Sequence, residues 1–362
     1  MSIGSKSDGR ESIASRRRFL QTTGAVGLVG LAGCSGGDNG DNGVVGGNGS
    51  PDHTWTIATV HSGDHIRNLA AERFAEEVES RSDNFDISLS TGGAYGGEIE
   101  MIETVQAGGV EMCSVTFGSI AAALNPGFAI FRGYPFMWSD WDHYISYFME
   151  LADVMGYYDG LIDDGVYPVT DPFFADQNGI ATTDWDEIQH PENMDGLDMY
   201  SPDAPGWADA LSALGANPQT LALTEVYGAM ETGTIQGRVA GTATMIDDAN
   251  HEIADTYNSI NMFINGTQMI LHNSEYESLS GEEEDILAEA ADIAEEVGEQ
   301  LAYETFDEYM GLMEEEYDVN VVTDIDMEPF REEVTPVVEG IIEEHDAPLG
   351  LDDIERHREE TR

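Results

Sequence analysis

The strongest constraint on the fold is an alternation of short strand-like segments with longer amphipathic ones. Residues 55–60, 86–89 and 112–115 have the apolar or alternating character of β-strands. Between them, apolar residues recur at helical spacing, first after a predicted cap at Asp64 and then after the glycines at 96–97. A β-α-β-α-β order needs crossover connections between parallel strands. The sequence therefore predicts an α/β protein with helices on the faces of a parallel sheet.

A second alternation begins near Gly165. Three further strands are expected, at 166–169, 197–200 and 220–223. A helix that contains Trp207 and ends at Gly215 separates the last two of these strands. The pattern then changes to one long amphipathic helix, and its start is predicted by a capping box of Ser280 and Glu283.

Residues 1–33 have the features of an export signal. Arg16 and Arg17 resemble a twin-arginine address, and an apolar run of about ten residues follows, which is too short for the ~20 residues of a membrane span. The run ends in a sequence that resembles a lipoprotein cleavage box with Cys34 as the lipid-anchored residue; the alternative is an ordinary signal in which Cys34 is incidental. Residues 34–54 are mostly Gly, Asn, Asp and Ser and predict a flexible tether. We therefore expect an extracytoplasmic, cell-surface lipoprotein exported by the twin-arginine pathway.

Acidic residues dominate the rest of the chain. From Cys34 onward there are nine arginines, no lysine and 69 aspartates and glutamates, a formal net charge of −60. This charge density repels itself unless salt screens it, with a Debye length of ~3 Å at 1 M. The acids are spread along the chain, which argues against a local acidic tail and excludes nucleic-acid binding. The composition is typical of a salt-adapted (halophilic) cell.

No catalytic or metal-binding pattern stands out. The His-Glu-x-x-His and Gly-x-x-x-x-Gly-Lys patterns are absent, and the nine histidines are scattered singly. The one Gly-x-Ser-x-Gly match, at 33–37, lies across the predicted cleavage box and is no nucleophile elbow. The spacing of Asp324, Asp326 and Glu328 is expected by chance in so acidic a chain. If Cys34 carries lipid, Cys113 has no disulfide partner and is expected to be a small buried residue. We expect no enzyme, cofactor or metal; a secreted hydrolase is the less favoured alternative.

Several short segments occur in an order that matches one family. They are the glycine-rich 92–98 with the helix 101–108, the segment 131–136 ending in Pro-Phe, the pair 194–197 and 214–218, and the segment 224–233. Together they resemble the solute-binding proteins of TRAP (tripartite, ATP-independent) transporters, the DctP-like family. The resemblance implies a two-lobed, type II periplasmic-binding-protein fold with a hinge, a cleft that closes on a small organic solute, and a long C-terminal helix. The implied partner is a membrane permease; an ATP-driven importer or a sensor is the alternative.

The same resemblance divides the chain into lobes. Lobe I is expected at 55–165 and lobe II at 166–265, and residues 266–346 are expected to return to lobe I with the long helix. Residues 347–362 are expected to be a frayed tail.

One departure from the family pattern bears on the site. The family usually has an arginine that pairs with the solute's carboxylate where this chain has Tyr200, which supplies no charge. Arg238 follows at the end of a strand that lines the cleft in the family. It is either a relocated anion anchor or a surface arginine paired with one of the many acids. Arg132 is a weaker candidate of the same kind.

Further candidates surround this position. Aromatic residues near the cleft mouth could pack against a solute or belong to the core, and His61 could donate to a solute or lie in a solvated loop. These additional candidates are Phe117, Phe174, Trp207, Tyr95 and His61. Arg67, Arg73 and Arg81 are expected on a solvated helix.

Overall fold

The computed structural model describes residues 51–124, 130, 134–201, 206–221, 223–247 and 249–362. The predicted export signal, Cys34, nearly all of the tether and Arg132 lie outside these residues. Within the described chain, no helix combines the length and apolar character needed to cross a membrane.

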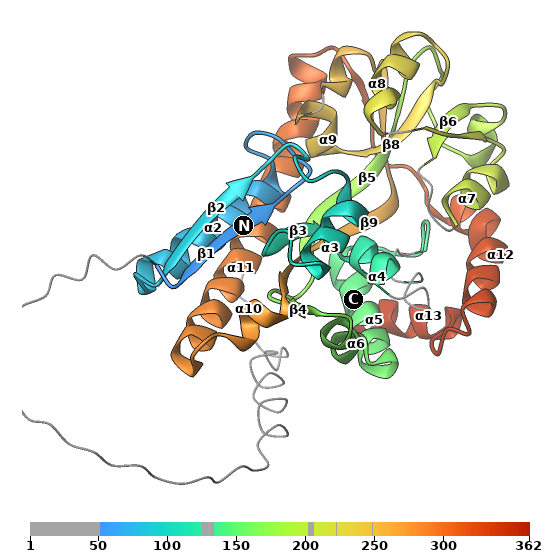
Figure 1. The fold of residues 1–362 in the computed structure, drawn as a ribbon. Coiled ribbons are helices and arrows are strands. Elements are labelled where there is room, and N and C mark those ends of the chain that lie inside the picture. Colours follow the sequence, from blue (N-terminus) through green and yellow to red (C-terminus); the bar gives the residue numbers. More distant parts are fainter. Residues whose placement is uncertain (1–50, 125–129, 131–133, 202–205, 222, 248) are drawn as a thin grey trace, which may run out of the picture. The chain divides into compact units, whose positions relative to one another are not determined.

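The first alternation folds as predicted into parallel strands joined by helices (Figure 1). The strands are β1 (His53–Ala58), β2 (Phe85–Ser90) and β3 (Met112–Thr116), and the helices are α2 (Ile66–Arg81), α3 (Glu98–Gln106) and α4 (Phe117–Leu124). β1 pairs in parallel with both β2 and β3, and we call these three strands the first parallel set. The cap of α2 was predicted at Asp64, but it is His65, because the His65 ring Nδ1 accepts the Arg67 N–H at 3.2 Å.

The second alternation forms another group of parallel strands. Its elements are β6 (Asp198–Ser201), α7 (Trp207–Ala213), β7 (Asn217–Thr220), α8 (Leu223–Glu231), β8 (Gly237–Gly241) and α9 (Thr242–Asp247). β6 pairs in parallel with β7 and β8, and these strands are the second parallel set. The strand predicted at 220–223 ends at Thr220 instead, since α8 already begins at Leu223.

Two long antiparallel strands join the sets into one sheet. They are β5 (Phe173–Thr182) and β9 (Thr256–His272), and the sheet order is β2-β1-β3-β9-β5-β8-β6-β7. The short strands β4 (Val166–Pro168) and β10 (Asn320–Val322) also pair with β9. The β5–β9 ladder is broken in the middle, because Asn178 pairs with Phe263 whereas Ile180 pairs with Asn258. Residues 259–262 of β9 therefore have no partner on β5.

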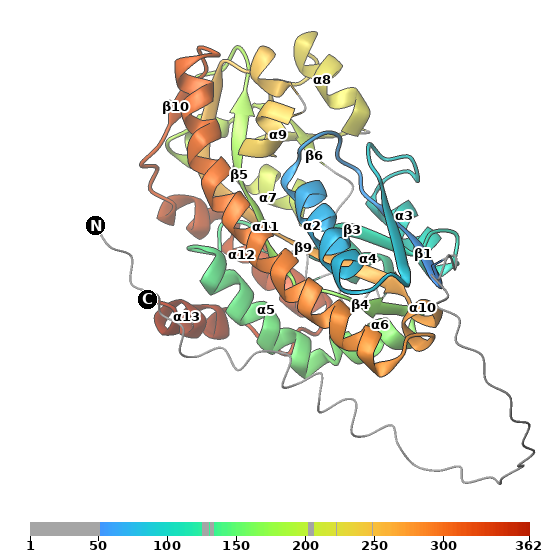
Figure 2. The same ribbon diagram turned by 90° about the vertical axis from the view of Figure 1, so that its left-hand side faces the viewer.

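The long C-terminal helix is confirmed. α11 (Gly281–Glu315) begins at the predicted capping box and packs along α2 (Figure 2). Its buried seam is rich in small residues, with Ala291, Ala294 and Gly298 in it. A Cβ at Gly298 would lie 2.5 Å from the Phe173 ring, so the close approach of helix and sheet requires glycine there.

The predicted frayed tail is wrong. Residues of the tail form α13 (Leu351–Glu360), which packs on α5 (Trp141–Met155). Arg358 is buried and donates from Nη2 to the Met137 carbonyl at 2.7 Å, and the ring of His143 bonds the Ile354 carbonyl at 2.8 Å. The remaining helical elements are α6 (Tyr157–Asp163), η2 (Pro191–Met194), η3 (Asn250–Glu252), α10 (Asn273–Glu277) and α12 (Glu328–Glu344).

Candidate functional site

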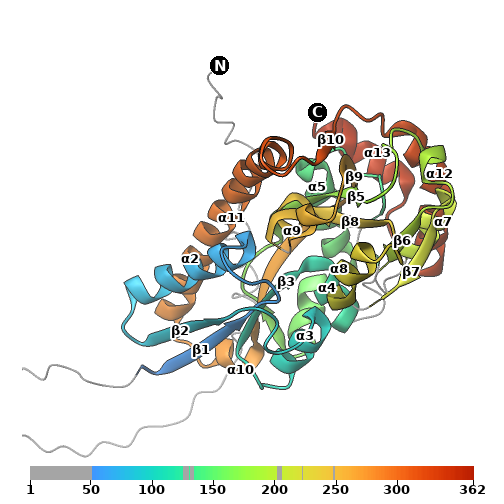
Figure 3. The same cartoon turned by 90° about the horizontal axis from the view of Figure 1, so that it is seen from above.

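The carboxyl ends of the two parallel sets converge on the middle of β9. β3 ends at Thr116, which lies opposite Thr267 of β9. β8 runs the other way and ends at Gly241, opposite Asn178 of β5, which is itself opposite Phe263 of β9. Along the strand direction the two ends are four residue steps apart, about 13 Å at ~3.3 Å per residue. Ligands of open α/β sheets bind outside the carboxyl ends of parallel strands, so this convergence marks the candidate site (Figure 3).

Tyr200 and Arg238 lie side by side in the second parallel set. Met199 of β6 is in register with Gly237 of β8, and the next residue of each strand therefore points to the same face of the sheet. Both side chains are buried. Burial raises the pKa of Tyr200, and the positive charge of Arg238 partly offsets this, as expected for close neighbours.

Arg238 is not a surface residue, which removes one of its two predicted roles. Only 6% of it is exposed, and its Nη1 donates to the Asn250 side-chain oxygen at 3.0 Å. Asn250 in turn donates to the Thr244 carbonyl at 3.0 Å, so the guanidinium is tied to the segment after β8. A buried guanidinium carries a large desolvation cost and is a strong donor to an anion.

The first parallel set contributes a pair of stacked imidazoles. His61 follows β1, and its ring lies 3.5 Å from the ring of His65 with an angle of 3° between the planes. Burial, assisted by the charge of Arg67, lowers the pKa of His61 to about 3. Both rings are therefore neutral at physiological pH, since the pKa of His65 is lowered to about 2 by burial, His61 and Arg67, against an opposing effect of Glu98.

Arg67 was predicted to be solvated, but it is buried. The helix α2 presents its first turn to α3, and Arg67 Nη1 lies 2.7 Å from Glu98 Oε1 at the start of α3. Arg73 and Arg81 are more exposed and pair with Glu77 along the same helix. The prediction of a solvated arginine therefore holds for Arg73 and Arg81 but is wrong for Arg67.

The predicted aromatic candidates separate into three environments. Phe117 packs edge-on against Phe148 and Tyr157 in the core, and Phe174 is buried against Trp141 and Tyr303. Tyr95 is 36% exposed in the glycine-rich loop before α3. Trp207 is half-buried and stacks on Phe263 of β9 with ring centroids 4.1 Å apart. Of these residues, Trp207 is the one held at the centre of β9.

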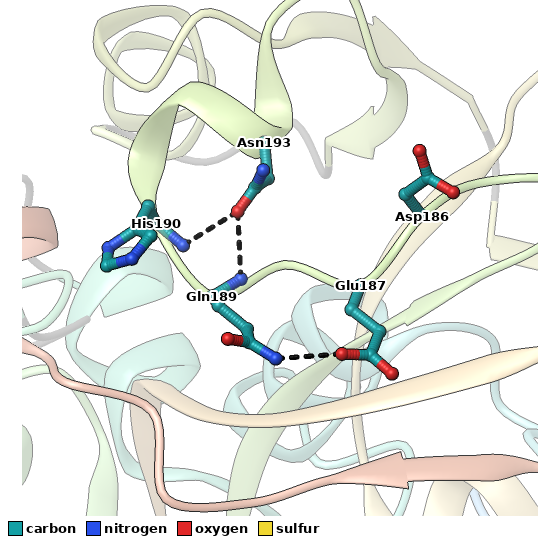
Figure 4. A pocket seen from close by; sticks show the side chains of 5 residues that line it. All are labelled: Asp186, Glu187, Gln189, His190 and Asn193. Atoms are coloured by element: carbon teal, nitrogen blue, oxygen red, sulfur yellow. Dashed lines mark hydrogen bonds between the residues drawn. The ribbon is translucent and has the colours of Figure 1, made fainter.

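A surface pocket of about 490 Å³ lies away from this convergence (Figure 4). It is lined by Asp186, Glu187, Gln189, His190 and Asn193. The Asn193 side-chain oxygen accepts the backbone N–H groups of Gln189 and His190, and Gln189 donates to Glu187. These contacts cap the short helix η2, which accounts for the polar lining.

No group of three or more potential metal ligands occurs among the described residues. Cys113 is buried in β3, and burial raises the pKa of its thiol well above the usual value, with a further contribution from Glu98. The thiol is therefore unreactive, as expected for a small buried residue.

A family model of bacterial extracellular solute-binding proteins, family 7 (DctP), matches residues 57–345. The chain belongs to this family. The predicted resemblance to TRAP solute-binding proteins is thereby confirmed.

Known relatives of this solute-binding protein cover most of its length. The ectoine/5-hydroxyectoine-binding periplasmic protein of Ruegeria pomeroyi is 26% identical over 304 residues, 82% of this chain and 87% of that one. The ectoine-binding periplasmic protein of Halomonas elongata is 25% identical, over 80% of this chain and 84% of its own.

Solved structures show the same fold. The TRAP periplasmic solute-binding protein of Anaerococcus prevotii, with bound glucuronate, superimposes with a TM-score of 0.75 at 22% identity, over 85% of this chain and 99% of that one. The sugar acid binding protein of Advenella mimigardefordensis, in complex with galactonate, gives a TM-score of 0.73 at 20% identity, over the same shares. The two-lobed fold predicted for this solute-binding protein is confirmed.

Sequence reasoning missed several residues around the site of this solute-binding protein. Phe263 lies in the short apolar run 262–264 of β9, where nothing in the sequence separates it from its two core neighbours. His65 is the cap and Arg67 lies in the first turn of α2, whose other arginines, Arg73 and Arg81, are more exposed. Glu98 had a usable signal, because it directly follows the glycine pair of the family motif.

Proposed function

We propose that this TRAP solute-binding protein captures a small organic solute with a carboxylate group and delivers it to a membrane permease. The solute lies between the carboxyl ends of the two parallel sets. Arg238 binds the carboxylate, Tyr200 and His61 offer hydrogen bonds, and Trp207 offers a ring face. Phe117 and Phe174 support the core instead of the solute.

The observation that carries this proposal is the burial of Arg238 beside Tyr200. The position of Tyr200 is where the family usually has its carboxylate-binding arginine, and Arg238 supplies a guanidinium on the adjacent strand. From Cys34 onward the chain has only nine arginines against 69 acids. Burying one of these nine, Arg238, beside Tyr200 carries a desolvation cost. A buried guanidinium is also a strong donor, and the carboxylate of the solute is proposed as one of its partners in addition to its contacts within the protein.

The solutes named for relatives support the same class. Ectoine, sialic acid, glucuronate and galactonate all carry a carboxylate. The test is a thermal-shift panel of these compounds and neutral sugars in molar NaCl, followed by titration calorimetry. We expect stabilisation by at least one carboxylate solute and none by neutral sugars. Stabilisation by neutral sugars alone would refute the proposed solute class.

We further propose that the protein reaches the cell surface of a salt-adapted cell by twin-arginine export and stays there through lipid on Cys34. The order of Arg16-Arg17, a short apolar run and Cys34 supports this, and so does the polar tether that follows. Lobe boundaries at 55–165, 166–265 and 266–346 are proposed on the same family pattern.

A further inference from the structure

One carboxylate joins the ends of several elements at the first parallel set. Glu98 Oε1 accepts from Arg67 of α2 at 2.7 Å and from the backbone N–H of Thr116 at 3.1 Å. Glu98 Oε2 accepts from the Thr116 hydroxyl at 2.6 Å, and that hydroxyl lies 2.6 Å from the hydroxyl of Ser119 in α4. The starts of α2, α3 and α4 and the end of β3 are therefore held at one point.

The loop that carries His61 is attached to the same start of α2. The backbone N–H of Arg67 donates to the ring of His65, and His65 stacks on His61. The ion pair therefore reaches these rings by holding the first turn of α2 in place, without a side-chain contact to them. Asn68 fixes the loop backbone, since its side-chain nitrogen donates to the carbonyls of His61 at 3.1 Å and Gly63 at 2.9 Å. The His61 ring is thus oriented by its neighbours, and its nitrogens make no hydrogen bond within the described chain.

We propose that the Arg67–Glu98 pair is a positioning unit that presents His61 to the solute as a neutral hydrogen-bonding group. Arg67 and Glu98 act through the loop and through His65, without touching the solute. The solute then has a hydroxyl or N–H group at the end opposite its carboxylate. This inference depends on the proposed function, because it requires a solute between the two parallel sets.

The charges around His61 support a neutral ring. Arg67 of α2 faces His61 and His65, and Glu98 of α3 faces Arg67 and His65. With the pKa of His61 held at about 3 by burial and Arg67, protonation of His61 makes no contribution to affinity between pH 5.5 and 8. Removing the charge of Arg67 raises the pKa of His61, but burial is the larger cause of the lowered pKa and remains, so the ring is expected to stay neutral in that range.

The first experiment compares Arg67→Met with the matched control Arg73→Met, which changes a more exposed arginine of the same helix. The affinity for the carboxylate compound of the panel that binds the wild-type protein is measured by calorimetry at pH 5.5 and 8. The protonation state of the His61 ring is measured by NMR. We expect Arg67→Met to lose at least tenfold in affinity at both pH values while the His61 ring stays neutral, and Arg73→Met to stay within twofold. An Arg67→Met affinity within twofold of wild type at both pH values would overturn the proposal.

The double variant Arg67→Met/Glu98→Gln separates positioning from stability. Replacing both members of a buried ion pair is often neutral for folding, whereas removing one leaves an uncompensated charge. We expect the double variant to melt close to wild type and still to bind at least tenfold more weakly. Wild-type affinity in a double variant that is fully folded would show that the pair has only a structural role.

The route through His61 is tested in the His61→Ala background. If Arg67 acts through His61, adding Arg67→Met to His61→Ala weakens binding by less than twofold further, because the two changes remove the same contact. Full additivity of the two losses would overturn this route. If wild-type protein binds no compound of the panel, the proposed function fails instead, which is a distinct result.

Discussion

At the scale of single residues, Arg238 is the residue on which the proposed carboxylate binding depends. Its guanidinium is buried beside Tyr200 and tied to Asn250, so it has a fixed position before any solute arrives. A fixed donor loses little conformational entropy on binding. If the proposed role is right, the desolvation cost of burying Arg238 during folding is accompanied by a gain in solute affinity.

We predict that Arg238→Ala weakens binding of a carboxylate solute by about 2–5 kcal/mol, because it removes one partner of a buried charge pair. Tyr200→Phe removes one neutral hydrogen bond and costs about 0.5–1.5 kcal/mol. Titration calorimetry in molar salt measures both losses.

Asn250→Ala is the control for Arg238. It removes the 3.0 Å hydrogen bond to Arg238 but keeps the guanidinium. If Arg238 only fastens the segment after β8, the Asn250 variant will lose as much affinity as Arg238→Ala, and the anion-anchor proposal will be wrong.

At the scale of elements, the start of α11 depends on one titratable group. Glu283 accepts hydrogen bonds from the Ser280 backbone N–H at 2.8 Å and from Asn84 at 2.9 Å, and these lower its pKa to about 2. Its folded pKa lies below the usual value. The stability it contributes is therefore present above pH ~4.5 and is lost as the pH falls toward 2.

We predict that Glu283→Gln lowers the free energy of unfolding at pH 7 by about 1 kcal/mol, the typical value of a helix cap. The difference from wild type should shrink as the pH approaches 2, because the wild-type carboxylate is then protonated. Denaturant unfolding at several pH values gives the comparison. Glu282→Gln, in the same first turn, serves as the control, and an equal effect of both changes would contradict the capping role.

Helices whose start has a local sequence pattern, such as a capping box, could be predicted. Which other elements cover the side chains of a helix or strand could not be predicted. Ser280 and Glu283 form a capping box within four residues, so the start of α11 was correct. Arg67 was misplaced, because helical periodicity tells which residues share a face but not which other element covers that face. Arg238 was found as a candidate, yet its burial depends on the neighbouring strand β6 and on Asn250, 12 residues further along the chain, and no local pattern shows either contact.

At the scale of the whole molecule, the net charge makes stability depend on salt concentration. From Cys34 onward the formal net charge is −60, and the described arginines on the surface already pair with carboxylates such as Glu77 and Glu150. Most acids therefore have only other acids as charged neighbours. Repulsion among these acids opposes the compact state and weakens when salt screens it.

We predict that the melting temperature falls as NaCl is diluted from molar to millimolar concentration, since the Debye length grows from ~3 Å at 1 M to ~30 Å at 0.01 M. Circular dichroism follows the transition at each concentration. A melting temperature that is constant or rises on dilution would contradict the inferred salt adaptation.

We also predict that Cys34→Ser releases the protein into the medium, because the lipid that retains it is lost. Cys113→Ser is the control, since Cys113 is buried in β3 and has no part in anchoring. Cell and medium fractions are compared by immunoblot. Retention of the Cys34 variant on cells would rule out the anchor.

The broken ladder between β5 and β9 bears on how such proteins can be recombined. β9 pairs with β10 and the end of β5 through Thr256–Asn258, and with β3 through Thr267–Leu271, so one continuous strand is shared by both halves of the sheet. A chimera that exchanges either half with a relative must therefore cut inside the unpaired residues 259–262, where no ladder bond to β5 is severed. Crossovers elsewhere in β9 would join two registers that evolved separately.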